Sequence, residues 1–172
     1  MNRLRILLPV LLALLFTAQT RPASAQLAVY AGFSGARTNG GSTEWVYGPL
    51  VGLYKQSGHL ASTINIGGDL RGSFIGRNGF HYYTGAVGPR IAFKAPIIPL
   101  RPYVEGLVGV ASYNAGSGTN STTHFDYQAI GGLDLTFFPH VDWRVIDFAY
   151  SAVSGQSVNA KILSTGLVIR IW

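Results

Sequence analysis

The stretch Phe125-Asp-Tyr-Gln-Ala-Ile-Gly-Gly-Leu-Asp-Leu-Thr-Phe-Phe138 alternates between two kinds of residue with the period of two that is typical of a β-strand. One face carries Phe125, Tyr127, Ala129, Gly131, Leu133, Leu135 and Phe137, and the other carries Asp126, Gln128, Gly132, Asp134 and Thr136. Only Ile130 breaks the pattern. A charge at mid-strand is costly inside an apolar core. We therefore expect the polar face to line a polar lumen and the apolar face to contact lipid.

Seven further segments also read as strands, and turn-rich linkers separate them. The eight segments are Leu27–Ser34, Trp45–Lys55, Leu60–Arg71, Tyr82–Lys94, Arg101–Tyr113, Phe125–Phe138, Asp142–Ala152 and Ala160–Trp172. Long Gly/Ser/Asn-rich linkers (Gly35–Glu44, Gly72–His81, Asn114–His124, Val153–Asn159) alternate with tight ones (Gln56–His59, Ala95–Leu100, Pro139–Val141). This layout predicts an all-β fold, an eight-stranded antiparallel transmembrane up-and-down β-barrel with both termini on the periplasmic side.

Charged residues recur at mid-strand on the predicted inner faces. An eight-stranded barrel is just wide enough for its side chains to fill, and buried charges need partners. We therefore expect a salt-bridge network that closes the lumen, with a narrow gated ion path as the alternative. Arg90 and Glu105 lie at similar distances from the Ala95–Leu100 turn, which predicts an ion pair between them. The predicted lumen network is Asp69, Arg71, Arg90, Glu105 and Asp134.

The N-terminus reads as a secretory leader. Arg3 and Arg5 precede an apolar stretch, and Ala23-Ser-Ala25 supplies the small residues that a signal peptidase reads. The apolar stretch is too short for a spanning helix, which needs roughly 20 residues. We expect a signal peptide over residues 1–25, cleavage after Ala25, and one barrel domain over residues 26–172.

The composition excludes several classes of site. The chain has no cysteine, which removes disulfides and thiolate metal sites. Three of its 13 basic residues lie in the leader, so ten basic residues face seven acidic ones in the mature chain, without a nucleic-acid-binding run. The four histidines lie in or beside linkers without metal-ligand spacing, and a weak cation site at His81, His124 and Asp126 is the alternative. We expect no cofactor and no metal.

Two C-terminal stretches resemble a known family. Tyr127–Val145 has a Gly-Gly-x-Asp strand, a Pro-His turn and an aromatic-Arg-Val restart, and Ser164–Trp172 is a strand that ends on an aromatic residue. They resemble the penultimate hairpin and the closing strand of the outer-membrane β-barrel domain family, the eight-stranded group that includes the membrane domain of outer membrane protein A and the small adhesin/invasin barrels.

The resemblance implies a monomer in the bacterial cell outer membrane, surrounded by outer-membrane lipid and lipopolysaccharide. It also implies insertion by the barrel-assembly machinery, which reads a C-terminal signal that we assign to Gly166, Val168 and Trp172. In the usual register of that signal these residues face lipid, together with Arg170. Ile146 and Arg144 are two residues apart and would point to the same face of a regular strand, although one is apolar and the other charged. This suggests a β-bulge between them.

The sequence is less specific about activity. Ser151, Ser154 and Ser157 are candidate nucleophiles, but no histidine pairs with them in an obvious way. We expect a non-enzymatic protein with a structural or surface-interaction role and an unidentified loop partner. A narrow porin-like ion or solute channel, a lipid-modifying enzyme and a soluble lipocalin-like barrel are the alternatives.

Overall fold

The computed structural model describes residues 26–39, 45–61, 63–77, 80–94, 98–114, 122–155 and 159–171. The predicted leader, the predicted cleavage position after Ala25, and Trp172 lie outside the described residues. Among the residues that are described, no helix is long and apolar enough to cross a membrane.

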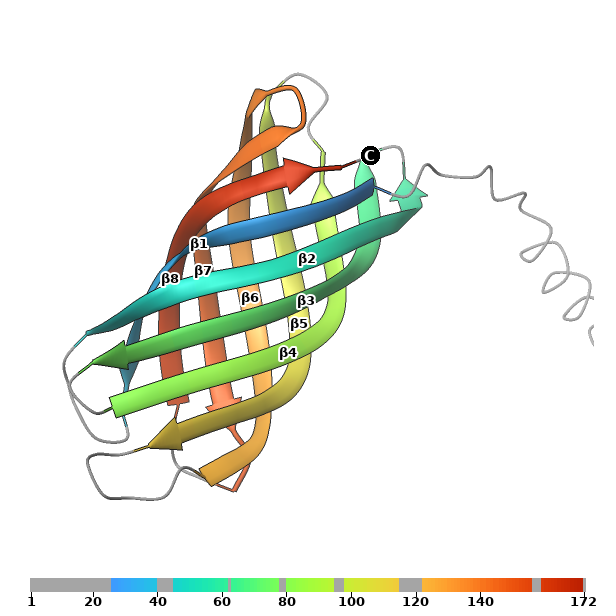
Figure 1. Cartoon of the computed structure of the whole chain (residues 1–172). Helices are drawn as coiled ribbons and strands as arrows, with labels where there is room; N and C mark the ends of the chain where they lie inside the picture. The colour runs from blue at the N-terminus through green and yellow to red at the C-terminus, as the bar shows by residue number, and fades with distance from the viewer. Residues whose placement is uncertain are drawn as a thin grey trace, which may run out of the picture.

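Eight antiparallel strands follow one another around a closed barrel (Figure 1). Each strand pairs with its neighbours in the chain, and β1 also pairs with β8, where Ala28 lies opposite Arg170. This confirms the predicted eight-stranded up-and-down barrel. The strands are β1 (Gln26–Thr38), β2 (Val46–Ala61), β3 (Ile64–Arg77), β4 (Phe80–Phe93), β5 (Leu100–Asn114), β6 (Thr122–Phe138), β7 (Val141–Val153) and β8 (Asn159–Arg170).

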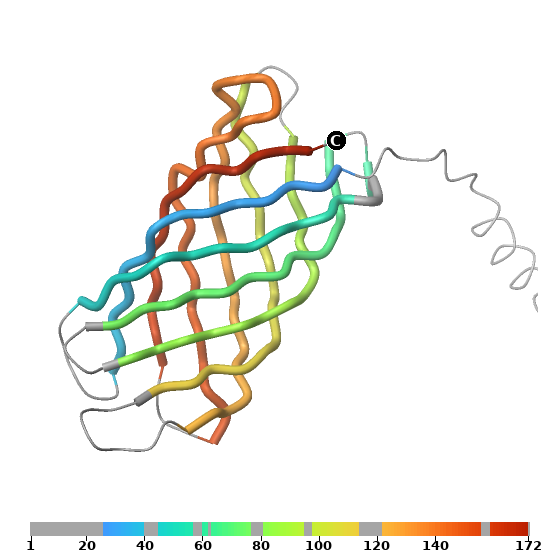
Figure 2. The backbone as a smooth tube through the Cα atoms, viewed as in Figure 1, coloured from blue at the N-terminus to red at the C-terminus, as the bar shows by residue number. Residues whose placement is uncertain are grey.

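The strands are long and strongly tilted, as the backbone trace shows (Figure 2). The start of β1 and the end of β8 lie at one end of the barrel, together with the β2–β3, β4–β5 and β6–β7 connections (Figure 1). We call this the turn end. The other ends of the strands lie at the opposite end of the barrel, which we call the loop end.

Two predicted linkers are wrong. Most of Gly72–His81 is strand, because β3 continues to Arg77 and β4 begins at Phe80. Alternation persists there, with Phe74 exposed and Ile75 fully buried, so the glycines that suggested a loop lie within a strand. The predicted Gln56–His59 turn also belongs to β2, whose register shifts between Gln56 and Gly58 and again before Ala61. Bulges of this kind extend a strand past residues that read as a turn.

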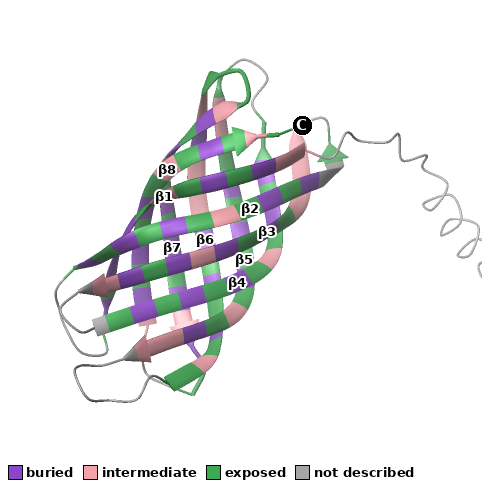
Figure 3. Ribbon diagram, in the orientation of Figure 1, coloured by how far each residue is buried: buried purple, intermediate pink, exposed green. Residues whose placement is uncertain are grey.

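Exposure alternates along every strand between an outward apolar face and an inward face (Figure 3). In β6 exposed and buried residues alternate strictly from Phe125 to Ile130, as predicted. Tyr127 is 51% exposed, whereas Asp126 and, further along the strand, Asp134 are at most 1% exposed. The inward face is divided along the barrel axis. An apolar cluster that includes Ile75, Tyr82 and Leu107 fills the part towards the loop end, and charged residues fill the middle.

The predicted bulge in β7 is present, but the predicted lipid-facing side of β8 is not. A bulge between Arg144 and Asp147 turns Arg144 inward and Ile146 outward, as predicted. The predicted lipid-facing register of β8 is wrong, because Val168 is fully buried while Leu167 and Ile169 are exposed. The inward register lets Arg170 pair with the buried carboxylate of Asp142 instead of facing lipid.

Candidate functional site

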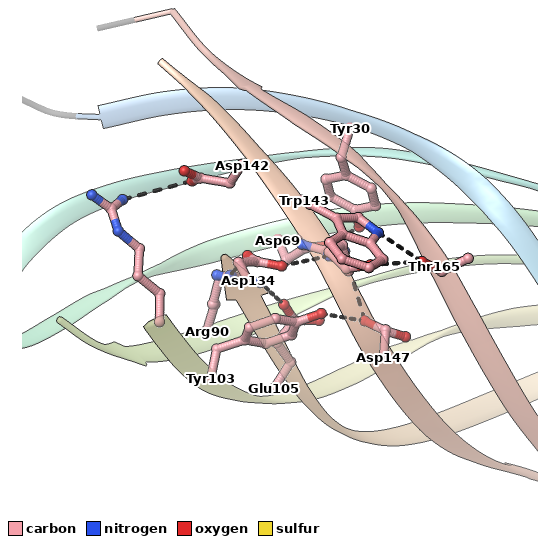
Figure 4. Close-up of polar contacts among 12 residues, drawn as sticks. Tyr30, Asp69, Arg90, Tyr103, Glu105, Asp134, Asp142, Trp143, Asp147 and Thr165 are labelled. Carbon is pink, nitrogen blue, oxygen red and sulfur yellow. Dashed lines mark hydrogen bonds and ion pairs between the residues drawn. The ribbon is translucent and has the colours of Figure 1, made fainter. Parts of the chain in front are cut away.

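The five residues predicted to form a lumen network lie inside the barrel, on β3, β4, β5 and β6. None is more than 5% exposed. Figure 4 labels Asp69, Arg90, Glu105 and Asp134. Arg90 and Glu105 are directly opposite each other on β4 and β5, and Arg90 Nη1 donates to Glu105 Oε1. This confirms the predicted ion pair.

Each of the two residues also has a second partner. Arg90 Nη2 lies 2.9 Å from Asp134 Oδ2, and Glu105 Oε2 lies 3.3 Å from Arg71 Nη2. Glu105 therefore bridges two arginines from different strands. Asp69 is attached less directly: Tyr30 donates to its Oδ1 at 2.7 Å, and Arg71 Nε donates to the same tyrosine oxygen at 3.3 Å.

The sequence analysis missed two members of the network, Arg144 and Asp147 of β7. Arg71 donates to both carboxylate oxygens of Asp147, at 2.9 and 2.7 Å. Arg144 Nε lies 3.1 Å from Asp134 Oδ1, and its Nη1 lies 3.6 Å from Asp147 Oδ2. Arg144 and Asp147 are three positions apart, so only the bulge between them brings both side chains to the inner face.

These contacts close a ring in which arginines and carboxylates alternate around the lumen. Every arginine contacts two carboxylates and every carboxylate contacts two arginines, so three positive charges balance three negative ones. This balance matters because an uncompensated charge in a low-dielectric interior is strongly destabilising. We call this the lumen ring, and its members in order are Arg71, Glu105, Arg90, Asp134, Arg144 and Asp147.

Three tyrosines pack against the arginines of the lumen ring. The guanidinium of Arg90 lies 4.2 Å from the ring centroid of Tyr54 and 3.7 Å from that of Tyr103. The guanidinium of Arg144 lies 4.9 Å from Tyr103 and 4.1 Å from Tyr30. Cations stacked on aromatic faces gain electrostatic attraction, most of all when desolvated. Tyrosines and arginines therefore alternate as a stack across the lumen.

Glycines make room for this stack. A Cβ atom at Gly132 would lie 2.3 Å from the Tyr103 ring, and one at Gly52 would lie 2.3 Å from the Tyr30 ring. Both distances are far shorter than an ordinary van der Waals contact. Tyr103 also donates to Asp147 Oδ2 at 2.5 Å, which ties the stack to the lumen ring. Together the lumen ring and the three tyrosines lie across the lumen, each at most 5% exposed, and an eight-stranded barrel is just wide enough for its side chains to fill.

Smaller polar clusters lie on either side of the lumen ring. Towards the turn end, Asp142 Oδ1 lies 3.0 Å from Arg170 Nη2 and accepts a hydrogen bond from Thr136 at 2.6 Å. Towards the loop end, Asp126 accepts hydrogen bonds from Gln128 and Ser151, at 2.6 and 2.5 Å.

The candidate nucleophile Ser151 and the candidate cation ligands do not form a common site, and Ser157 lies outside the described residues. Ser151 is fully buried and donates to Asp126, and its oxygen lies 2.7 Å from that of Tyr82. His81 faces outward beside the exposed Tyr83, whereas Asp126 faces the lumen, so the alternative His81, His124 and Asp126 cation site does not form. Within the described ranges, no group of three possible metal ligands is present.

The residues assigned to the assembly signal, Gly166, Val168 and Trp172, do not share one environment. Gly166 lies opposite Gly32 of β1, where a Cβ atom would lie 2.4 Å from the carbonyl oxygen of Ala31. Val168 packs in the lumen with Tyr30 and Tyr54, and Trp172 is outside the described residues. The role of these residues in assembly stays a prediction.

No family model matches the sequence, and no curated protein matches it. Solved structures do resemble the fold. The Neisserial surface protein A (NspA) superposes with a TM-score of 0.61 at 15% identity, over 84% of this chain and 97% of that one. Ail, the attachment invasion locus protein of Yersinia pestis, solved with the heparin analogue sucrose octasulfate, gives 0.55 at 16% identity over 86% and 99%.

The outer membrane enzyme PagL gives a TM-score of 0.55 at 16% identity, over 83% of this chain and 99% of that one. An enzyme and an attachment protein thus share this architecture, and likeness at such identities shows the fold alone. The chain has the fold of the eight-stranded outer-membrane β-barrels.

Proposed function

We propose that the protein is a bacterial outer-membrane barrel with a closed lumen and a non-enzymatic structural or surface-interaction role. The observation that carries this proposal is the lumen ring with its stacked tyrosines. Three arginines, each in contact with two carboxylates, and three large aromatic rings occupy the interior that a channel would need. The surfaces left for function are the outer wall of the barrel and the loop end.

The outer wall supports the membrane assignment. Large apolar side chains on all eight strands are exposed, among them Phe33 at 57%, Val104 at 57% and Leu167 at 52%. Monomeric soluble proteins rarely expose contiguous apolar patches of more than a few hundred Å². Lipid would solvate this surface, and the charged interior distinguishes the protein from a soluble lipocalin-like barrel, whose interior is apolar.

Orientation and assembly follow the pattern of such barrels. We propose that the turn end faces the periplasm and the loop end the exterior, and that the barrel-assembly machinery recognises the closing strand. Large apolar side chains point outward from that strand at Leu163, Leu167 and Ile169, and Ile171 directly after it is also exposed, so together they offer an apolar surface for that recognition. We propose that the inserted protein is a monomer surrounded by outer-membrane lipid and lipopolysaccharide.

The non-enzymatic assignment rests on the surroundings of the serines. A nucleophilic serine needs a general base within hydrogen-bond reach. Ser151 does donate to the carboxylate of Asp126, but both side chains are fully buried in the lumen, where no lipid substrate reaches them. A lipid-modifying enzyme remains the rival class, and comparing outer-membrane lipids from cells with and without the protein distinguishes the two.

Membrane fractionation followed by gel electrophoresis of heated and unheated samples tests the proposal. We expect the protein in the outer-membrane fraction, with faster migration before heating because the closed barrel resists the detergent. Recovery as a soluble periplasmic protein would refute the membrane assignment. New or missing lipid species in the lipid comparison would refute the non-enzymatic role.

A further inference from the structure

The lumen of the barrel holds charges of both signs, whereas the exposed charges of the described residues are of one sign. Six of the seven acidic residues lie in the described ranges, and each is at most 5% exposed inside the lumen. The exposed charged side chains in those ranges are all basic. A surface charge of one sign selects partners of the other sign. The exposed basic residues are Arg37, Lys55, Lys94 and Lys161.

Two of these residues face each other directly. Arg37 of β1 and Lys161 of β8 are cross-strand partners, and both point outward. Side chains in this arrangement have Cβ atoms about 5 Å apart, and like charges there destabilise a sheet. Among the described residues no carboxylate relieves the repulsion, because all six lie on the inner face. An anion held between the two side chains would turn this repulsion into attraction.

The position of the pair indicates what kind of anion fits. Arg37 and Lys161 are one and two residues from the strand ends, Thr38 and Asn159, at the loop end. Lys161 lies opposite the exposed Tyr150 of β7, and the exposed Trp45 directly precedes β2. Tyrosine and tryptophan at this height are typical of the membrane–water interface, where lipid headgroups lie.

Below the pair the surface becomes apolar. Leu163, two residues further along β8, is 43% exposed and lies opposite the exposed Phe148. Phe33 of β1 is also exposed. A lipid whose phosphate contacts the two cations would lay its acyl chains over these residues. A soluble anion would leave this apolar surface unused.

We propose that Arg37 and Lys161 form a binding site for a phosphate group of lipopolysaccharide in the outer leaflet. The site rests on the proposed membrane location, because only there does the loop end face that leaflet. It goes beyond general contact with lipid, since it names two cations on adjacent strands and the apolar side chains beneath them. The other two exposed basic residues, Lys55 and Lys94, are not cross-strand partners of each other. Lys55 lies opposite Gly68.

The test measures binding of lipopolysaccharide to the detergent-solubilised full barrel. The variant Arg37→Gln/Lys161→Gln removes the paired cations, and Lys55→Gln/Lys94→Gln removes the same charge elsewhere. A basic residue near an anionic membrane surface changes affinity roughly fivefold. We expect about a 25-fold loss for the first variant, a less than threefold loss for the second, and similar weakening when wild type meets dephosphorylated lipopolysaccharide.

Three outcomes overturn the site. Equal losses in both variants would show unspecific charge attraction, and unchanged binding of dephosphorylated lipopolysaccharide would exclude the phosphate. Equally tight, pair-dependent binding to phosphatidylglycerol vesicles would assign the site to phospholipid instead. Fractionation of wild type separates this inference from the proposed function: a barrel found in the outer membrane with unaltered variant affinity refutes the site alone.

Discussion

Replacing Glu105 by glutamine tests the lumen ring at a carboxylate that bridges two arginines. Glu105 contacts both Arg90 and Arg71, and it is only 5% exposed. Glutamine keeps the shape and one acceptor oxygen but removes the negative charge. The lumen ring would then hold three arginines against two carboxylates.

The expected cost can be worked out from the remaining contacts. Breaking a buried ion pair by removing one partner typically costs about 3–5 kcal/mol. Arg90 would keep Asp134 and Arg71 would keep Asp147, at 2.9 and 2.7 Å. We therefore expect a loss of about 3 kcal/mol in unfolding free energy, at the lower end of that range.

Removing Arg90 as well should recover part of this loss. In Glu105→Gln/Arg90→Met the remaining two arginines and two carboxylates are balanced and still connected through Asp134, Arg144, Asp147 and Arg71. We expect the double variant to be more stable than Glu105→Gln by about 1 kcal/mol or more, within the range of coupling between contacting residues.

The assay is urea-induced unfolding in lipid vesicles or detergent, followed by tryptophan fluorescence. Asp126→Asn is the matched control, because Asp126 is also buried but is hydrogen-bonded to the neutral Gln128 and Ser151. Removing its charge therefore leaves no arginine without an ion-pair partner. Strictly additive losses in the double variant, or an equal cost for Asp126→Asn, would refute the reasoning.

Three further predictions concern packing, lipid contact and assembly. Gly132→Ala should destabilise the barrel by about 1–3 kcal/mol because its Cβ would lie 2.3 Å from Tyr103, whereas Gly131→Ala, with open space around it, should be nearly neutral; equal unfolding midpoints would contradict this. Leu133→Arg should cost about 2–4 kcal/mol in lipid vesicles if the residue lies near the bilayer midplane, and a water-accessible spin label at position 133 would show that it does not face lipid. Deleting Trp172 should lower outer-membrane levels in cells more than stability in detergent, and normal levels would count against its role as an assembly signal.

Much of the fold follows from alternation alone. Asp126 and Tyr127 fall on opposite faces because successive side chains of a strand point in opposite directions. The Arg90–Glu105 pair follows from the same rule, since residues equally far from a turn become cross-strand partners.

The remaining features depend on irregularities that a periodic pattern does not show. The bulge in β7 places Arg144 and Asp147 on one face, which completes the lumen ring. Glycines in Gly72–Arg77 resemble a loop in composition but form strand in the closed barrel. In β8 the ion pair of Arg170 with Asp142 goes with an inward register that a terminal-aromatic pattern alone does not indicate.

The conductance of single barrels in a planar bilayer tests most directly whether the lumen is closed. After insertion has been verified by heat-dependent migration, wild type is predicted to give no steady current, because the lumen ring and three tyrosines fill the interior. The Glu105→Gln/Arg90→Met variant serves as a probe of the same closure. A stable, reproducible open conductance in wild type would contradict the account and favour a narrow ion channel.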